Sequence, residues 1–202
     1  MDRVPPEVHS RIKKMTIEHT SIPEVVIVHP DIFRDARGYF FESFNEKTFA
    51  KMMYPVHFVQ DNESKSCYGT VRGLHYQKGD AAQAKLVRVI RGRVLDIAVD
   101  LRVGSPTFGK WTAAELSGEN ASQLFIPRGF AHGFSVLSEE AVFQYKCDAF
   151  YDPSAEGAVA WDDPDLAIDW GLPAKDVLLS EKDRRHRCLK DIPARDLFTY
   201  AK

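Results

Sequence analysis

The chain has 202 residues, with 27 Lys and Arg against 29 Asp and Glu and a formal net charge of −2. This length suits one domain with a substantial core, and the balanced charge creates no overall field that would attract a nucleic acid or a membrane surface. An anionic ligand would need a local cluster of cations. We therefore expect no nucleic-acid partner and no membrane attachment.

The first residues, MDRVPPEVHSRIKKM, are charged and lack the apolar core of a signal peptide. No apolar run in the sequence approaches the ~18 residues of a membrane span. Cys67, Cys147 and Cys188 are widely spaced and form no C-x-x-C pair, so we expect free thiols rather than disulfides or zinc ligands. These features predict a cytoplasmic protein with residues 1–21 as an N-terminal extension.

The elements predicted in the N-terminal part are short. Residues 31–38 are rich in turn formers, and residues 45–53 predict a short helix with Asn45 as its N-cap. Residues 63–68 read as a polar connection. Apolar and aromatic runs predict strands at residues 25–28, 39–44 and 56–62.

The central part of the chain predicts a series of strands separated by Gly and Pro. Short strands at roughly ten-residue spacing indicate an all-β fold, as an antiparallel sandwich, jelly roll or barrel. Beyond residue 151 the chain turns irregular, and a short C-terminal helix is expected to begin at Ser180. The predicted strands cover residues 70–77, 84–90, 94–101, 108–116, 123–127, 131–137 and 141–147.

The stretch from residue 70 to residue 101 places four residues that can do chemistry on strands. In residues 94–101 apolar and polar residues alternate, which aims Asp96 at a polar cavity or at water. The same period puts Arg72 and His75 on opposite faces, unless Gly73 marks a bulge that changes the phase. Lys85 lies on the adjoining strand, and buried Lys and Arg are rare without a partner.

Each of these candidates also has a purely structural interpretation. Buried histidines such as His75 commonly just satisfy hydrogen bonds, and Lys85 as an edge-strand residue would keep neighbouring molecules from pairing. His132 forms a conceivable metal pair with His75. A cupin-type site usually has two His separated by one residue and a nearby Glu, however, and position 77 is Gln. We therefore expect no metal.

Tyr145, Tyr151 and Asp183 also have purely structural interpretations. Tyr145 lies among apolar residues typical of a core, and Tyr151 fits an ordinary surface aromatic. Ser180-x-x-Asp183 resembles a capping box, in which the carboxylate only ties down a helix start. Asp96 rivals Asp183 as the partner of His75. The basic run at residues 184–187 is expected to be a solvated face.

Several longer motifs follow one another in unbroken order between residues 22 and 185. They include Asp35-Ala-Arg-Gly38, Gln60-Asp-Asn62, Arg72-Gly-Leu-His75, Gln83-x-Lys85, Ser105-Pro-Thr-Phe-Gly-x-Trp111, Ile126-Pro-x-Gly-Phe-Ala-His132-Gly, Tyr145-Lys146 and Ser180-x-Lys-Asp183. In these motifs the chain resembles the dTDP-4-dehydrorhamnose 3,5-epimerase family. The resemblance marks residues 22–185 as the epimerase domain and residues 186–202 as a C-terminal tail.

The resemblance implies a double-stranded β-helix, that is, a cupin-like jelly roll, with a few short helices mainly near the C-terminus. It implies a homodimeric isomerase without metal or other cofactor, which converts dTDP-4-dehydro-6-deoxy-D-glucose to dTDP-4-dehydro-L-rhamnose. That step belongs to dTDP-L-rhamnose biosynthesis for cell-surface polysaccharide such as lipopolysaccharide. Relatives that invert a single carbon, C3 or C5, share the motifs, so that activity is an alternative. A non-catalytic sugar-binding cupin is an alternative of another class.

By motif position, the resemblance makes His75 the base, Asp183 its orienting partner, Lys85 the enolate stabiliser and Tyr145 the acid. Tyr151 falls where the family stacks on thymine. The residue types suit the chemistry, because a C4 ketone acidifies C3–H and C5–H and a cation stabilises the resulting enolate. The substrate contacts that it implies are Arg37, Phe40, Glu42, Gln60, Asp61, Asn62, Arg72, His132, Tyr151, Glu156 and Lys182.

Overall fold

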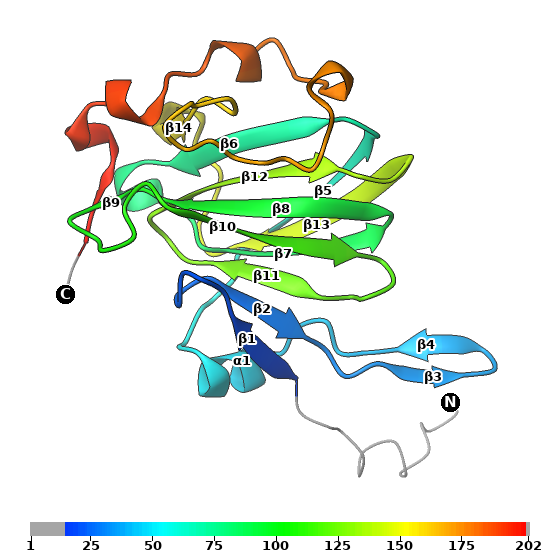
Figure 1. The fold of residues 1–202 in the computed structure, drawn as a ribbon. Helices are drawn as coiled ribbons and strands as arrows, with labels where there is room; N and C mark the ends of the chain where they lie inside the picture. The colour runs from blue at the N-terminus through cyan, green and yellow to red at the C-terminus, as the bar shows by residue number, and fades with distance from the viewer. Residues whose placement is uncertain (1–14, 201–202) are drawn as a thin grey trace.

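Two antiparallel sheets form the body of the protein, which the computed structural model describes over residues 15–200 (Figure 1). The six-stranded sheet has the order β1-β2-β11-β7-β13-β5, with bounds Thr16–His19, Val26–His29, Gln123–Ile126, Lys85–Arg91, Glu140–Cys147 and Gln60–Cys67. The five-stranded sheet has the order β10-β8-β12-β6-β14, with bounds Trp111–Ser117, Arg93–Asp100, Phe130–Val136, Val71–Gln77 and Glu156–Ala158. The predicted all-β jelly roll is confirmed.

Apolar side chains pack in three layers around these sheets. The layer between the sheets includes Phe134 and Phe143, which stack with ring centroids 4.2 Å apart. The outer face of the five-stranded sheet is covered by the C-terminal part of the chain, including Trp170. On the six-stranded sheet, Phe49 from helix α1 (Glu46–Met52) covers the outer face. Because both sheets are buried on two faces over much of their area, their strands are largely apolar.

Most predicted elements are present, and the exceptions lie on the N-terminal side. Asn45 caps α1 as predicted, since its side chain accepts a hydrogen bond from the Thr48 backbone. The strand predicted at residues 39–44 is present only at residues 39 and 40, in β4 (Gly38–Phe40), which forms a short hairpin with β3 (Phe33–Asp35). The polar connection predicted at residues 63–68 is wrong. Residues 63–67 belong to β5, an edge strand whose polar residues hide the strand period. The strand predicted at residues 56–62 overlaps β5 only at residues 60–62.

Strand β6 contains the irregularity that decides where its polar side chains point. Arg72 pairs with Phe134 and His75 with His132, so β6 has one residue more than β12 between these pairs. The extra residue shifts the alternation and turns Arg72 and His75 to the same side of the sheet. Gly73 has φ +129°, and a Cβ there would lie 2.6 Å from the Cα of Gly133. Only glycine fits this position.

The C-terminal part of the chain crosses over the five-stranded sheet (Figure 1). The helix expected from Ser180 is only a short 3-10 turn, η5 (Asp183–Arg185). Leu189 and Ile192 then pack into the apolar layer on that sheet, and β15 (Phe198–Thr199) pairs with β9 (Arg102–Val103). The other 3-10 turns are η2 (Gly79–Ala81), η3 (Pro153–Ala155), η4 (Ala174–Asp176), η6 (Leu189–Asp191) and η7 (Ala194–Asp196).

At the other end, β1 belongs to the expected N-terminal extension and pairs with β2, whereas residues 1–14 lie outside the described part of the chain. None of the helices within residues 15–200 has the length and apolar character needed to cross a membrane.

Candidate active site

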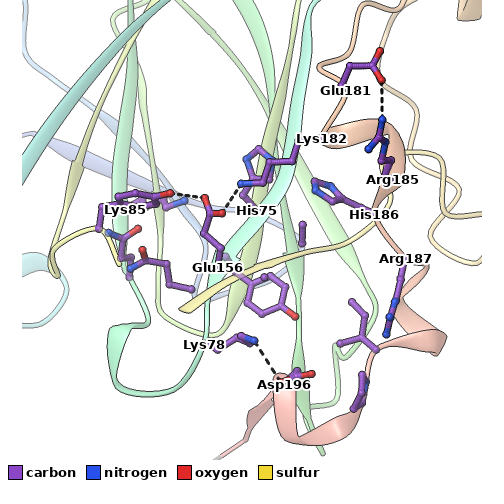
Figure 2. A pocket seen from close by; sticks show the side chains of 18 of the residues that line it. His75, Lys78, Lys85, Glu156, Glu181, Lys182, Arg185, His186, Arg187 and Asp196 are labelled. Carbon is purple, nitrogen blue, oxygen red and sulfur yellow. Dashed lines mark hydrogen bonds and ion pairs between the residues drawn. The ribbon is translucent and has the colours of Figure 1, made fainter. Parts of the chain in front are cut away.

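A cavity of about 770 Å³ lies where the two sheets and the C-terminal segment meet (Figure 2). This volume is in the usual range for small-molecule sites. Strand β6 of one sheet and strands β7 and β13 of the other all contribute to it. Six of the residues that the sequence assigned to catalysis or to substrate line it: His75, Lys85, Tyr145, Tyr151, Glu156 and Lys182.

His75 is held by Asp183, which lies behind it on the C-terminal segment. The His75 Nε2 and the Asp183 Oδ1 are 2.6 Å apart. A carboxylate only accepts hydrogen bonds, so Nε2 carries the hydrogen and Nδ1 keeps its lone pair. Burial by itself raises the pKa of Asp183, but the hydrogen bonds from His75 and Ser180 outweigh it and the net shift is downward. Asp183 therefore stays ionised beside His75.

The capping box predicted at Ser180 and Asp183 is present only in part, because the Asp183 carboxylate bonds to His75 and to the Ser180 hydroxyl. The Asp183 backbone N–H donates to the Ser180 Oγ at 3.1 Å, as at a helix start. The Ser180 hydroxyl in turn donates to Asp183 Oδ2 at 2.8 Å, which leaves Oδ1 for His75. The Ser180 hydroxyl thus orients the Asp183 carboxylate toward His75.

Asp96, the rival partner of His75, contacts a different histidine. His132 donates from Nε2 to both carboxylate oxygens of Asp96, at 3.0 and 3.1 Å. Burial lowers the pKa of His132, which keeps its ring neutral in this interior site. Burial likewise lowers the pKa of Lys85, while Cys147 and Asp96 act in the opposite direction. The positive charge of Lys85 in turn opposes the burial that raises the pKa of Asp96.

Tyr145 reaches the cavity from the sheet opposite to that of His75. Tyr145 lies on β13 of the six-stranded sheet, and His75 lies on β6 of the five-stranded sheet. Burial raises the pKa of the Tyr145 hydroxyl, although the nearby Arg72 opposes this shift. Tyr145 therefore keeps its proton at neutral pH and can donate it. A molecule in the cavity would therefore have His75 on one side and Tyr145 on the other.

A second polar group lies beside the first and includes three of the predicted substrate contacts (Figure 2). The Tyr151 hydroxyl donates to Glu156 Oε1 at 2.8 Å, and Lys182 forms an ion pair with the other oxygen of Glu156. The hydrogen bond from Lys182 is the main cause that lowers the pKa of Glu156. The Tyr151 backbone N–H donates to the Gln60 side chain at 2.9 Å. These contacts preorganise one wall of the cavity.

Three other predicted contacts, Gln60, Asn62 and Arg72, lie outside the cavity lining. Gln60 donates to Asn62 at 2.9 Å, and Asn62 pairs with Tyr145 across the ladder. Arg72 donates from Nε to the Ser66 Oγ at 3.1 Å. Gln60 and Asn62 thus contact Tyr151 and Tyr145 of the cavity lining. The lining itself includes neither of them, nor Arg72.

Among the remaining predicted contacts, His132 is buried against Asp96 and does not line the cavity, and the other four lie apart from the cavity of the same chain. Asp61 forms an ion pair with Lys146 at 2.9 Å. Arg37, Phe40 and Glu42 lie on or just after the β3–β4 hairpin, which projects from the body (Figure 1). Phe40 is 63 % exposed there. A single copy of the chain does not bring these residues to His75.

The C-terminal segment adds cavity residues that the sequence analysis missed. The three arginines of the basic run are exposed, as predicted for a solvated face, but His186 is not. Arg185, His186 and Arg187 line the cavity. The His186 side chain is only 12 % exposed, and its Nδ1 lies 3.8 Å from Asp183 Oδ1. Burial lowers the pKa of His186. No feature of the basic run itself marks His186, because its burial depends on how the segment folds back over β6.

The profile of the family described as dTDP-4-dehydrorhamnose 3,5-epimerase matches residues 19–191. The enzyme of that name from Pseudomonas aeruginosa is 52 % identical over 179 residues, which are 88 % of this chain and 97 % of the relative. A dTDP-4-dehydrorhamnose 3-epimerase from Streptomyces niveus is 38 % identical over 191 residues, 93 % of this chain and 90 % of the relative.

Solved structures agree with the sequence comparison. A dTDP-6-deoxy-D-glucose-3,5-epimerase from Legionella pneumophila, crystallised with dTDP-4-keto-L-rhamnose, superposes with a TM-score of 0.90 and is 49 % identical. The match covers 93 % of this chain and all of that one, 100 %. The chain therefore belongs to the dTDP-4-dehydrorhamnose 3,5-epimerase family.

Proposed function

We propose that this protein epimerises dTDP-4-dehydro-6-deoxy-D-glucose at C3 and C5 to give dTDP-4-dehydro-L-rhamnose. The observation that carries the proposal is the placement of His75 and Tyr145 on opposing sheets around one cavity, with Lys85 in the same lining. Inversion at a carbon requires a proton to leave one face and another to arrive at the opposite face. This arrangement provides both groups.

In the proposed mechanism, the Nδ1 of His75 removes the proton from the carbon next to the C4 ketone. The electron pair of that C–H bond moves into the carbonyl and forms an enolate, whose negative oxygen the Lys85 ammonium stabilises. The Asp183 carboxylate stabilises the imidazolium that forms. Tyr145 then donates its proton to the opposite face. The carbon skeleton is neither oxidised nor reduced, so the reaction needs no redox cofactor.

Inversion at both carbons is favoured over inversion at one. The relative named as a 3,5-epimerase in Pseudomonas aeruginosa is 52 % identical to the chain, whereas the 3-epimerase of Streptomyces niveus is 38 % identical. Both activities use the same proton transfers, so the difference lies in whether the intermediate turns its C5 toward the base. A protein that only binds sugar would need no oriented base, so the sugar-binding alternative does not explain the hydrogen-bonded pair of His75 and Asp183.

For the nucleotide end of the substrate, the proposal uses the polar wall of Tyr151, Glu156 and Lys182. The Tyr151 ring is 54 % exposed at the cavity and offers a flat surface on which thymine can stack. Arg72 suits a diphosphate because a guanidinium matches phosphate oxygens. In this proposal residues 22–185 are the catalytic domain, residues 186–200 complete the cavity wall, and the protein works in the cytoplasm.

A homodimer accounts for the predicted contacts on the hairpin. Arg37 and Phe40 lie away from the cavity of their own chain, and Tyr39 and Phe40 are 58 % and 63 % exposed. Exposed neighbouring aromatic side chains are typical of a surface that binds another protein. In the proposed dimer the hairpin of one copy reaches the cavity of the other, and the two-fold symmetry makes the exchange reciprocal.

The decisive experiment follows the 4-keto sugar nucleotide by NMR in D₂O. Deuterium is expected to enter at C3 and C5 as the L-rhamno product forms, and His75→Asn is expected to abolish both. His57→Asn is the matched control, because His57 is exposed and pairs with Glu46 far from the cavity. Exchange at one carbon would support the single-carbon alternative, and no exchange by the wild type would support the sugar-binding alternative.

A further inference from the structure

His75, Asp183 and His186 bring three potential metal ligands together at the inner wall of the cavity. Their ligand atoms all lie within 4.8 Å of one another, and residues 15–200 contain no other such group of three or more His, Cys, Asp or Glu. Two imidazole nitrogens with one carboxylate oxygen are a donor set that Zn²⁺ commonly takes with its fourth position open. His132, the other conceivable metal partner of His75, is not part of this group.

An independent observation at His186 points to a missing partner. Its Nδ1 is buried and has no hydrogen-bond partner among the described residues, although it lies 3.8 Å from Asp183 Oδ1. Buried polar atoms in folded proteins nearly always have a partner, so this nitrogen calls for an explanation. The ring also meets that of His75 edge-on, with centroids 5.7 Å apart. A cation placed between the three side chains would give the Nδ1 of His186 its partner.

We propose that His75, Asp183 and His186 form a Zn²⁺ site, and that zinc in this site switches the enzyme off. Ligand atoms of a tetrahedral zinc site with bonds of about 2.0–2.1 Å lie roughly 3.3 Å apart. The distances from Asp183 Oδ1 to the His75 and His186 nitrogens, 2.6 Å and 3.8 Å, lie on either side of that value. To admit the ion, the His75 nitrogen would move away from Asp183 Oδ1 and the His186 nitrogen would move toward it.

Inhibition follows from the tautomer of His75. In the metal-free site Nε2 carries the hydrogen and donates it to Asp183, and Nδ1 is the base. A neutral imidazole that binds zinc through Nε2 must carry its one hydrogen on Nδ1. Zinc binding thus moves the hydrogen from Nε2 to Nδ1 and removes the lone pair that accepts the substrate proton. The inhibition rests on the proposed function, but the binding does not.

The site is tested first without reference to activity, with Co²⁺ as a spectroscopic substitute for Zn²⁺. The wild-type protein is expected to bind one Co²⁺ per chain with visible d–d bands of a low-coordinate N/O site, and one equivalent of Zn²⁺ should remove them. His186→Phe keeps a ring in place but removes a ligand, and it should weaken binding by about 100-fold or more. His57→Phe should bind as the wild type does. Circular dichroism checks that both variants are folded.

Activity is tested second, with zinc buffered by a chelator. Zn²⁺ should inhibit epimerisation by the wild type and by His57→Phe, excess EDTA should restore the full rate, and His186→Phe should require about 100-fold more zinc for the same fractional loss relative to its own zinc-free rate. Absence of the d–d bands in the wild type, or equal zinc affinity in His186→Phe, would overturn the proposal whatever the activity. A wild type that binds zinc but shows no epimerase activity in EDTA would instead contradict the proposed function.

Discussion

His75 and Asp183 are 108 positions apart in the sequence, yet their Nε2 and Oδ1 atoms lie 2.6 Å apart. The contact joins the middle of strand β6 to the turn that opens the C-terminal segment. One hydrogen bond thus sets the tautomer of the proposed base and also ties the C-terminal wall of the cavity to the sheet. Substitutions at either residue are expected to affect chemistry more than folding.

Asp183→Asn should slow exchange at C3 and C5 by about a hundredfold or more, because an amide can donate to Nε2 and force the hydrogen onto Nδ1. Asp96→Asn is the comparison variant, since Asp96 is buried with His132. This substitution is expected to lower the melting temperature more than it lowers the exchange rate. NMR exchange rates and melting curves of both proteins provide the test. A greater loss of exchange in Asp96→Asn would make Asp183 a structural cap only.

Tyr145→Phe separates proton removal from proton return. If Tyr145 delivers the second proton, the enolate still forms but returns its proton to the original face, so inversion should fall further than deuterium uptake. A tyrosine with only a structural role would lose a hydrogen bond worth about 0.5–1.5 kcal/mol and leave the ratio of inversion to uptake unchanged. Measuring both quantities by NMR in D₂O, together with the melting temperature, distinguishes the two roles.

The fall of kcat at alkaline pH is expected to follow the deprotonation of the Lys85 ammonium. Burial lowers the pKa of Lys85, so its ammonium is lost as the pH rises through a value below the ordinary ~10.4 of lysine, and enolate stabilisation is lost with it. Tyr145 does not explain such a fall, because burial raises the pKa of its hydroxyl. In Lys85→Arg the fall should move to higher pH, since guanidinium does not titrate in this range. A fall at unchanged pH would exclude Lys85 as its source.

Gly73→Ala should destabilise the protein by more than about 3 kcal/mol, because the new methyl group collides with the backbone of β12 at a positive φ. Gly79→Ala is the matched control. Gly79 also has a positive φ, +57°, but no atom lies within 4 Å of the place its new methyl group would occupy, so the cost should be only about 1 kcal/mol. Chemical denaturation of both variants measures the difference. Equal costs would show that the close approach of β6 and β12 is not required.

Mixing two inactive variants tests whether the hairpin acts across a dimer. His75→Asn removes the base and keeps the hairpin, whereas Phe40→Ala with Arg37→Ala damages the hairpin and keeps the base. If the hairpin serves the other copy, random exchange of subunits restores about a quarter of the sites. Light scattering checks the dimer and NMR measures the regained rate. No recovery after proven subunit exchange would place the hairpin outside the partner's site.

Much of the fold was predictable because local sequence determines it. Alternating or continuous apolar runs between Gly and Pro predicted most strands, and Asn45 predicted the start of α1, because strand periodicity and capping depend on near neighbours. Only the first three residues of β5 fell within a predicted strand, because its polar edge residues show no apolar alternation. The family resemblance singled out His75, Lys85 and Tyr145, and these side chains do share one cavity.

Tertiary structure alone decided the geometry of the site. Sequence left both Asp96 and Asp183 as partners of His75, and the packing of the C-terminal segment over β6 selected Asp183. The bulge at Gly73 places Arg72 on the same side of the sheet as His75, whereas a strict period of two would place them on opposite sides. The same packing buried His186 within a basic run. Such contacts depend on which segments distant in the sequence meet in the fold, and local sequence patterns do not specify these long-range contacts.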